Sequence, residues 1–123
     1  MHALVVDDSR VMRSILTRLL GTNGFSVAQA GDGQQALDLL ASGPLPDVAL
    51  VDWNMPVMDG LSFVSACRKD PRLRPVALMM MTTESEHGQI VKALAAGAHE
   101  YLIKPFTPGA LLDKLSLLGF PAI

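Results

Sequence analysis

The chain has 123 residues, a formal net charge of −2 and an apolar fraction of 50%. This length suits one domain, and we expect a single domain over 1–123. The near-neutral charge argues against a nucleic-acid partner, which usually requires a basic face. The longest unbroken apolar run is 76–81, far short of the roughly 20 residues that a membrane span needs, so we expect no membrane partner.

Cysteine usage and the N-terminus bear on localisation. Cys67 is the only cysteine, so the chain cannot form an internal disulfide, which fits a reducing compartment. The N-terminus has no basic region followed by a long apolar stretch, so there is no sign of an export signal. Both observations predict a cytoplasmic protein.

Apolar, β-type runs and amphipathic helical patterns alternate along the chain. The predicted strands are 3–6, 25–30, 48–51, 76–81 and about 100–103. The predicted helices are 10–20, 34–41, 61–69, a segment from Ser85 or Glu86 to Ala96, and a last helix that begins near Pro108. This alternation predicts an α/β fold, a doubly wound parallel sheet of five βα units.

The first predicted helix has clear end signals. Ser9 can cap its N-terminus, and Gly21 and Gly24 are expected to end it. Its apolar residues recur at helical spacing and predict one apolar stripe, formed by Val11, Met12, Ile15, Leu16 and Leu19.

Four of the predicted strands run directly into polar residues. These are Asp7-Asp8, Asp52, Thr82 and Lys104. Parallel strands end at the same edge of a sheet, where open α/β folds bind ligands. The pattern therefore predicts one pocket that contains three carboxylates, a hydroxyl and an ammonium.

Such a pocket has the chemistry of metal-assisted phosphoryl transfer. Three carboxylates repel each other without a cation, and Mg²⁺ prefers oxygen ligands such as these. Asp52 stands alone at its strand end and is the better candidate nucleophile, since carboxylates do accept phosphoryl groups covalently. Lys104 and Thr82 can stabilise charge on the transferring group.

The order of these motifs identifies a family resemblance. The motifs are Asp7-Asp8-Ser9-Arg10, Asp52-Trp53-Asn54-Met55-Pro56, Met81-Thr82-Thr83-Glu84 and Lys104-Pro105-Phe106. From Leu4 to about Leu118 the chain resembles the receiver domains of two-component response regulators, and among them the CheY-like single-domain regulators. The resemblance implies the flavodoxin-like strand order 2-1-3-4-5 and a receiver domain over 1–123 with no effector domain.

The resemblance also implies a set of metal ligands and a phosphoacceptor. Asp52 is expected to take a phosphoryl group from a phosphohistidine on a sensor histidine kinase or a histidine phosphotransfer domain. Asp8, Asp52 and the backbone carbonyl of Asn54 are expected to hold Mg²⁺ or Mn²⁺, with Asp7 acting mainly through water. Lys104 is expected to bind the phosphoryl oxygens together with Thr82, and the Lys104–Pro105 peptide to be cis.

The resemblance also implies residues that change conformation on phosphorylation and residues that set the lifetime of the phosphoform. Tyr101 is the expected switch aromatic, which turns inward when Thr82 moves toward the phosphate. Asn54 and Glu84 are expected to set the lifetime of the phosphoform and to keep it short.

The output surface is expected on the fourth helix, fifth strand and fifth helix. Ile90, Tyr101 and Lys114 match the family's motor-binding face, whereas His87 departs from the lysine of the chemotaxis pattern.

We therefore expect a monomeric switch whose phosphorylation controls binding to a motor switch or another target in chemotaxis or motility. We expect it neither to act as an enzyme on other substrates nor to bind nucleic acid. A phosphorelay intermediate or a phosphate sink is the alternative. A haloacid-dehalogenase-type phosphohydrolase is a remote one, since the chain lacks the Asp-x-Asp motif after its first strand. A flavin-binding module is disfavoured because the acidic pocket repels a flavin phosphate.

Overall fold

The computed structural model describes residues 1–83 and 87–120. Within these ranges the strands are β1 (His2–Val6), β2 (Ser26–Ala30), β3 (Val48–Asp52), β4 (Ala77–Thr82) and β5 (Glu100–Ile103). The helices are α1 (Arg10–Thr22), α2 (Gly33–Ser42), α3 (Gly60–Lys69), α4 (His87–Ala96), α5 (Pro108–Leu117) and the short 3₁₀ helix η1 (Pro71–Leu73). The strands pair in parallel in the order β2-β1-β3-β4-β5, which confirms the predicted fold and strand order.

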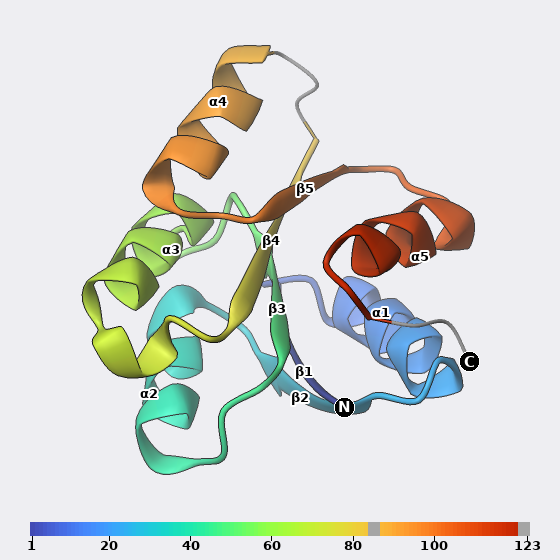
Figure 1. Cartoon of the computed structure of the whole chain (residues 1–123), viewed down its shortest axis with the longest axis horizontal. Helices are drawn as coiled ribbons and strands as arrows, with labels where there is room; N and C mark the ends of the chain where they lie inside the picture. The colour runs from blue at the N-terminus through green and yellow to red at the C-terminus, as the bar shows by residue number, and fades with distance from the viewer. Residues whose placement is uncertain (84–86, 121–123) are drawn as a thin grey trace.

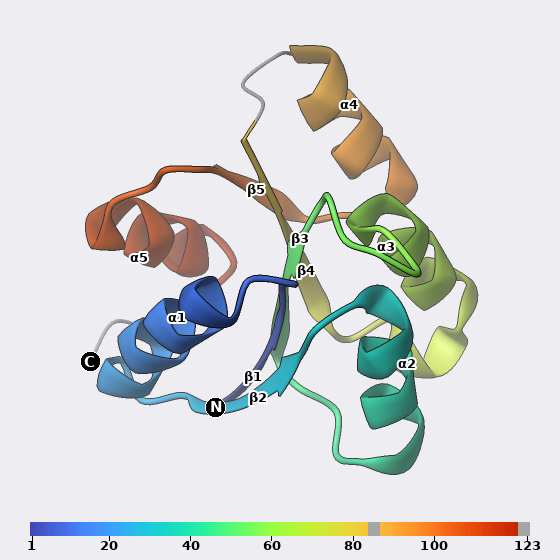
Figure 2. The same cartoon turned by 180° about the vertical axis from the view of Figure 1, so that it is seen from behind.

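The sheet lies between two layers of helices. Figures 1 and 2 show α1 and α5 on one face and α2, α3 and α4 on the other. Successive strand residues alternate between two apolar cores: Ala3 and Val5 pack on the α1/α5 side, and Leu4 and Val6 on the opposite side. Burial of both faces explains why the central strands are apolar throughout.

The helix α1 begins where it was predicted and ends later. The Ser9 hydroxyl accepts a hydrogen bond from the Met12 N–H, as a cap should. The prediction that Gly21 ends the helix is wrong, because α1 continues to Thr22 and Asn23 follows as its C-terminal cap. Gly24, with φ of 88°, then turns the chain toward β2.

The predicted apolar stripe on α1 is wrong in part. Leu16 is buried, but Val11 is 70% exposed and Ile15 is 46% exposed. Val11 and Ile15 form an i, i+4 row beside the row that contains Leu16 and Leu20, and the sheet and α5 cover only the second row. Helical spacing alone did not distinguish the two rows.

Other boundaries agree with the predictions to within one or two residues. The Thr107 hydroxyl caps α5, and Pro108 occupies its first turn as predicted. The predicted start of the fourth helix at Ser85 or Glu86, and the rate-tuning role predicted for Glu84, lie outside the described residues. Within the described ranges, none of the helices combines the length and apolarity that crossing a membrane takes.

Candidate functional site

The acidic residues meet at the carboxyl edge of the sheet. Asp7 and Asp8 follow β1, and Asp52 ends the neighbouring strand β3. Each of the three carboxylates offers an oxygen, and these oxygens lie within 4.8 Å of one another. Asp7 is fully buried, Asp52 is 8% exposed and Asp8 is exposed to solvent. A cluster of hard oxygen donors that is open on one side suits a hydrated Mg²⁺ ion.

Lys104 connects the two buried carboxylates. Its Nζ lies 2.8 Å from Oδ2 of Asp7 and 3.2 Å from Oδ1 of Asp52. The strand β5 delivers this lysine, and its backbone N–H donates to the carbonyl of Thr82 at 2.7 Å. The Lys104–Pro105 peptide is cis, as the resemblance implied.

Backbone and side-chain groups hold Asp7 in place. Its Oδ1 accepts from the Ser9 N–H at 2.9 Å, so both of its carboxylate oxygens have a donor. Its backbone carbonyl accepts from Nη1 of Arg13 at 2.6 Å. No sequence motif points to Arg13, because only the packing of α1 against β1 brings this side chain to the acidic site.

The electrostatics of the site disfavour a charged Asp52. Burial raises the pKa of the Asp52 carboxyl, the charges of Asp7 and Asp8 raise it further, and Lys104 offsets only part of the effect. Burial by itself lowers the pKa of Lys104, but hydrogen bonds and charges from Asp7 and Asp52 outweigh this and raise it. Lys104 therefore stays an ammonium, and the carboxylates retain an excess of negative charge that a divalent cation can balance.

The other predicted site residues lie around this centre. Thr82 is buried at the end of β4, and it is paired with Ile103 on β5. Asn54 is exposed in the β3–α3 loop, two residues beyond Asp52. This loop returns to the sheet through a hydrogen bond from the Gly60 N–H to the Trp53 carbonyl at 2.9 Å.

The predicted output residues are separated from the acidic centre. Ile90 is half-buried on α4, and Tyr101 is half-buried on β5 at the open edge of the sheet. Lys114 on α5 places its Nζ 3.9 Å from the centroid of the Tyr101 ring. The same ammonium forms an ion pair with Glu100 at 2.8 Å. No sequence spacing connects Glu100 to Lys114, so this ion pair was not predicted.

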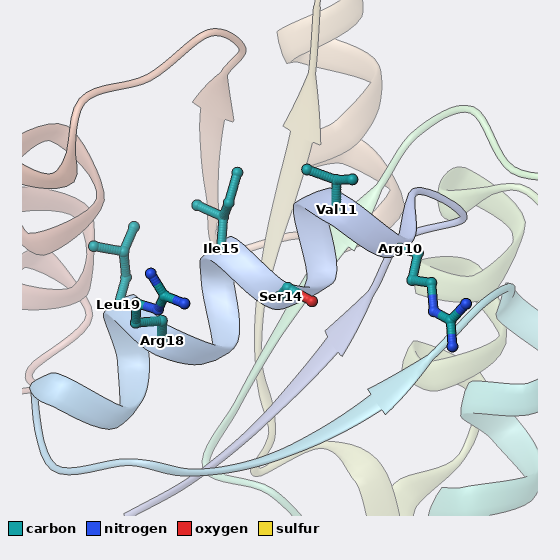
Figure 3. A pocket seen from close by; sticks show the side chains of 6 residues that line it. All are labelled: Arg10, Val11, Ser14, Ile15, Arg18 and Leu19. Atoms are coloured by element: carbon teal, nitrogen blue, oxygen red, sulfur yellow. The ribbon is translucent and has the colours of Figure 1, made fainter.

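A shallow hollow of about 430 Å³ lies on the outer side of α1. Figure 3 shows the side chains that line it. They are Arg10, Val11, Ser14, Ile15, Arg18 and Leu19. The hollow contains none of the predicted site residues.

Comparison with known proteins defines the class. A family model described as "Response regulator receiver domain" matches residues 3–116. The chain is 40% identical to the chemotaxis protein CheY1 of Helicobacter pylori over 119 residues, 96% of each chain. It is 42% identical to the chemotaxis protein CheY of Pseudomonas aeruginosa over 94% of this chain and 93% of that one.

Solved structures agree. The chemotaxis response regulator CheY4 of Vibrio cholerae superposes with a TM-score of 0.89 and 36% identity, covering 95% of this chain and 97% of that one. The chain therefore belongs to the response regulator receiver domain family. Within that family it is a CheY-like receiver, a class of signalling domain and not of classical enzymes.

Proposed function

We propose that this chain is a single-domain response regulator in which Asp52 accepts a phosphoryl group from a phosphohistidine. The supporting observation is the network at the sheet edge: three carboxylates in mutual reach, with Lys104 bridging Asp7 and Asp52. The chemotaxis names of its relatives support a role in chemotaxis or motility. We further propose that the domain works in the cytoplasm as a monomer.

The reaction is a displacement at phosphorus. A carboxylate oxygen of Asp52 forms the new P–O bond, the P–N bond to the donor imidazole breaks, and the imidazole nitrogen keeps the electron pair. In this proposal Lys104, which donates to Asp52, and the buried Thr82 bind the phosphoryl oxygens as charge shifts onto them. The chain thus catalyses only its own phosphorylation and dephosphorylation.

The donor set fits Mg²⁺, with Mn²⁺ as a substitute. Asp8, Asp52 and the Asn54 carbonyl would hold the ion, and Asp7 would act mainly through water. When bound, the ion neutralises the carboxylates and polarises the phosphoryl oxygens. Asn54, together with Glu84, is proposed to keep the phosphoform short-lived, so a half-life of many hours with Mg²⁺ present would count against this role.

Phosphorylation with radiolabelled acetyl phosphate tests the proposal. With Mg²⁺, the wild-type protein should acquire a label that hydroxylamine removes, and Trp53 fluorescence should change because this residue adjoins Asp52. Asp52→Asn should acquire no label, whereas Asp59→Asn, which alters an exposed helix cap in the same loop, should still be labelled. Labelling of Asp52→Asn at the wild-type level would show that another residue is the acceptor.

The choice of partner needs a second experiment. The phosphorylated and unphosphorylated proteins can be tested for binding to a motor switch protein and to a histidine phosphotransfer domain. Phosphorylation-dependent binding to the motor protein supports a chemotaxis output. Phosphoryl exchange with the phosphotransfer domain alone supports the alternative, a relay intermediate or phosphate sink.

A further inference from the structure

The open edge of the sheet carries a three-residue contact network that is distinct from the acidic site. Oε1 of Glu100 accepts from Nζ of Lys114 at 2.8 Å and from the backbone N–H of Tyr101 at 3.0 Å. The Lys114 ammonium in turn lies 3.9 Å from the centroid of the Tyr101 ring. The same Glu100 oxygen thus binds both the backbone of Tyr101 and the Lys114 ammonium that lies over the Tyr101 ring.

The location of the ring follows from the topology. Leu102 packs in the core on the α1/α5 side, so the preceding residue, Tyr101, starts from the opposite face of β5. Lys114 belongs to α5, on the Leu102 side. Its ammonium therefore meets the Tyr101 ring across the open edge of the sheet, where β5 has no further strand beside it.

The ion pair between Glu100 and Lys114 is more buried than an ordinary surface ion pair. The side chains of Glu100 and Lys114 are only 16% and 23% exposed. A cation over an aromatic face attracts the ring more strongly as water is excluded from the contact. The carboxylate directs the ammonium onto the ring, since a lysine side chain has many other rotamers that reach solvent.

We propose that Glu100 is a positioning residue of the switch: through Lys114 it clamps the Tyr101 ring at the sheet edge and so disfavours its inward turn. The proposal rests on the role of Tyr101 in the proposed function. In this proposal the observed contact holds the ring outward, and an inward turn breaks the contact between ammonium and ring. A cation–π contact of this kind corresponds to about a two- to five-fold bias in a conformational equilibrium.

The clamp can be tested without phosphorylation. Tyr101 is the only tyrosine, so 3-fluorotyrosine labelling gives one ¹⁹F NMR signal from this ring. Lys114→Met defines the signal of a ring without the cation. Glu100→Gln keeps an acceptor for the Tyr101 N–H but loses the ion pair, and its signal should move most of the way to that of Lys114→Met. Asp113→Asn removes the same charge from a neighbouring exposed position and should leave the wild-type signal in place.

Two results of this first experiment overturn the clamp. A Lys114→Met signal identical to wild type would show that the cation does not lie over the ring in solution. A Glu100→Gln signal identical to wild type, with Lys114→Met shifted, would show that Glu100 does not position the cation. Far-UV circular dichroism of each variant confirms that the fold is intact.

The second experiment adds Mg²⁺ and acetyl phosphate and measures the ratio of inward to outward ring signals. Glu100→Gln should raise this ratio by about two- to five-fold over wild type, and Asp113→Asn should leave it unchanged. An unchanged ratio in Glu100→Gln overturns the proposed bias. Loss of the phosphodonor response in every protein, including wild type, overturns the proposed function instead, and the first experiment still decides whether the clamp exists.

Discussion

At the scale of single residues, the fold places Asp52 where its charge is unfavourable. Burial raises the pKa of its carboxyl, and Asp7 and Asp8 add repulsion that Lys104 only partly offsets. The raised pKa means that the folded, metal-free protein holds a charged Asp52 less favourably than the unfolded chain does. Functional sites commonly hold groups in such unfavourable states, and a bound cation relieves them.

Asp52→Asn should therefore stabilise the metal-free protein at pH 7. The pKa of Asp52 is raised in the folded state. The contribution of this carboxyl to the free energy of unfolding is therefore fully present below the ordinary carboxyl pKa and is lost as pH rises through the folded pKa. In EDTA, the melting temperature of Asp52→Asn should exceed that of wild type at pH 7, and the difference should shrink toward pH 4. Asp113→Asn serves as the control for charge alone. A wild type that is more stable than Asp52→Asn at pH 7 would contradict this reasoning.

His99 should make stability depend on pH in the opposite sense. Its Nδ1 accepts from the Leu78 N–H at 3.0 Å, which an imidazolium cannot do. Partial burial, and then the charge of Arg68, lower the pKa of His99. The contribution of His99 to the free energy of unfolding is therefore present above the ordinary histidine pKa and is lost as pH falls through the folded pKa. The effect is modest because His99 is exposed.

Denaturant unfolding between pH 7.5 and pH 5 measures this effect. Wild type should lose more stability over this range than His99→Gln, which cannot titrate. Equal slopes for wild type and His99→Gln would show that the hydrogen bond to Leu78 does not control this titration.

At the scale of elements, two glycines near the C-terminal ends of helices have different structural roles. Gly97 adopts a φ of +118° after α4, and a Cβ there would lie 2.1 Å from Cγ of Arg68. Gly21 lies inside α1, and a Cβ there would meet nothing within 4 Å. The first glycine is required by the backbone and its packing, whereas the second is replaceable.

Substitution by alanine should separate the two positions. Gly97→Ala should destabilise the protein by more than about 1–2 kcal/mol, since strain and a clash add. Gly21→Ala should stabilise it by about 0.5–1 kcal/mol, since alanine loses less entropy in a helix. Urea denaturation midpoints measure both effects. A tolerated Gly97→Ala would mean that Arg68 can move away from this turn.

The β3–α3 loop contains a strained residue. Val57 has a φ of +69° and is 83% exposed. A β-branched residue is unfavourable in this left-handed region, whereas asparagine adopts it more readily. Val57→Asn should therefore raise stability by about 1 kcal/mol. Val57→Ala keeps a Cβ but removes the β-branch, so a gain as large as that of asparagine would show that the β-branch alone is the source of the strain.

At the scale of the whole molecule, the site joins parts of the chain that are far apart. Asp7 follows β1, Asp52 ends β3 and Lys104 follows β5, so the site exists only when the sheet is assembled. A ligand of this site binds the folded state alone and must stabilise the whole domain.

Mg²⁺ should consequently raise the unfolding free energy in proportion to the logarithm of its concentration. At 100 times the dissociation constant the gain should be about 2.7 kcal/mol, measured by thermal or denaturant unfolding. Asp8→Asn should reduce the gain, and Asp113→Asn should leave it intact. A wild-type stability that is independent of Mg²⁺ would contradict a metal site at the acidic cluster.

The amino-acid sequence by itself determined the alternation of strands and helices, the order of the motifs and the residues that follow each strand. These are local signals, because β-type runs, caps and strand-end carboxylates, such as Asp7 and Asp52, are encoded by neighbours in the chain. They were sufficient to predict the sheet, its family and the edge at which the acidic residues meet.

Only the tertiary structure decided which side of an element is covered and which distant residues touch. Helical spacing placed Val11 and Ile15 in the buried stripe of α1, but the sheet and α5 cover the adjacent row. The contacts of Glu100 and Lys114 around Tyr101 likewise depend on how α5 packs beside the open edge of the sheet. The physical reason is the same in both cases: packing joins surfaces by their three-dimensional shape, and sequence periodicity does not specify the partner of each surface.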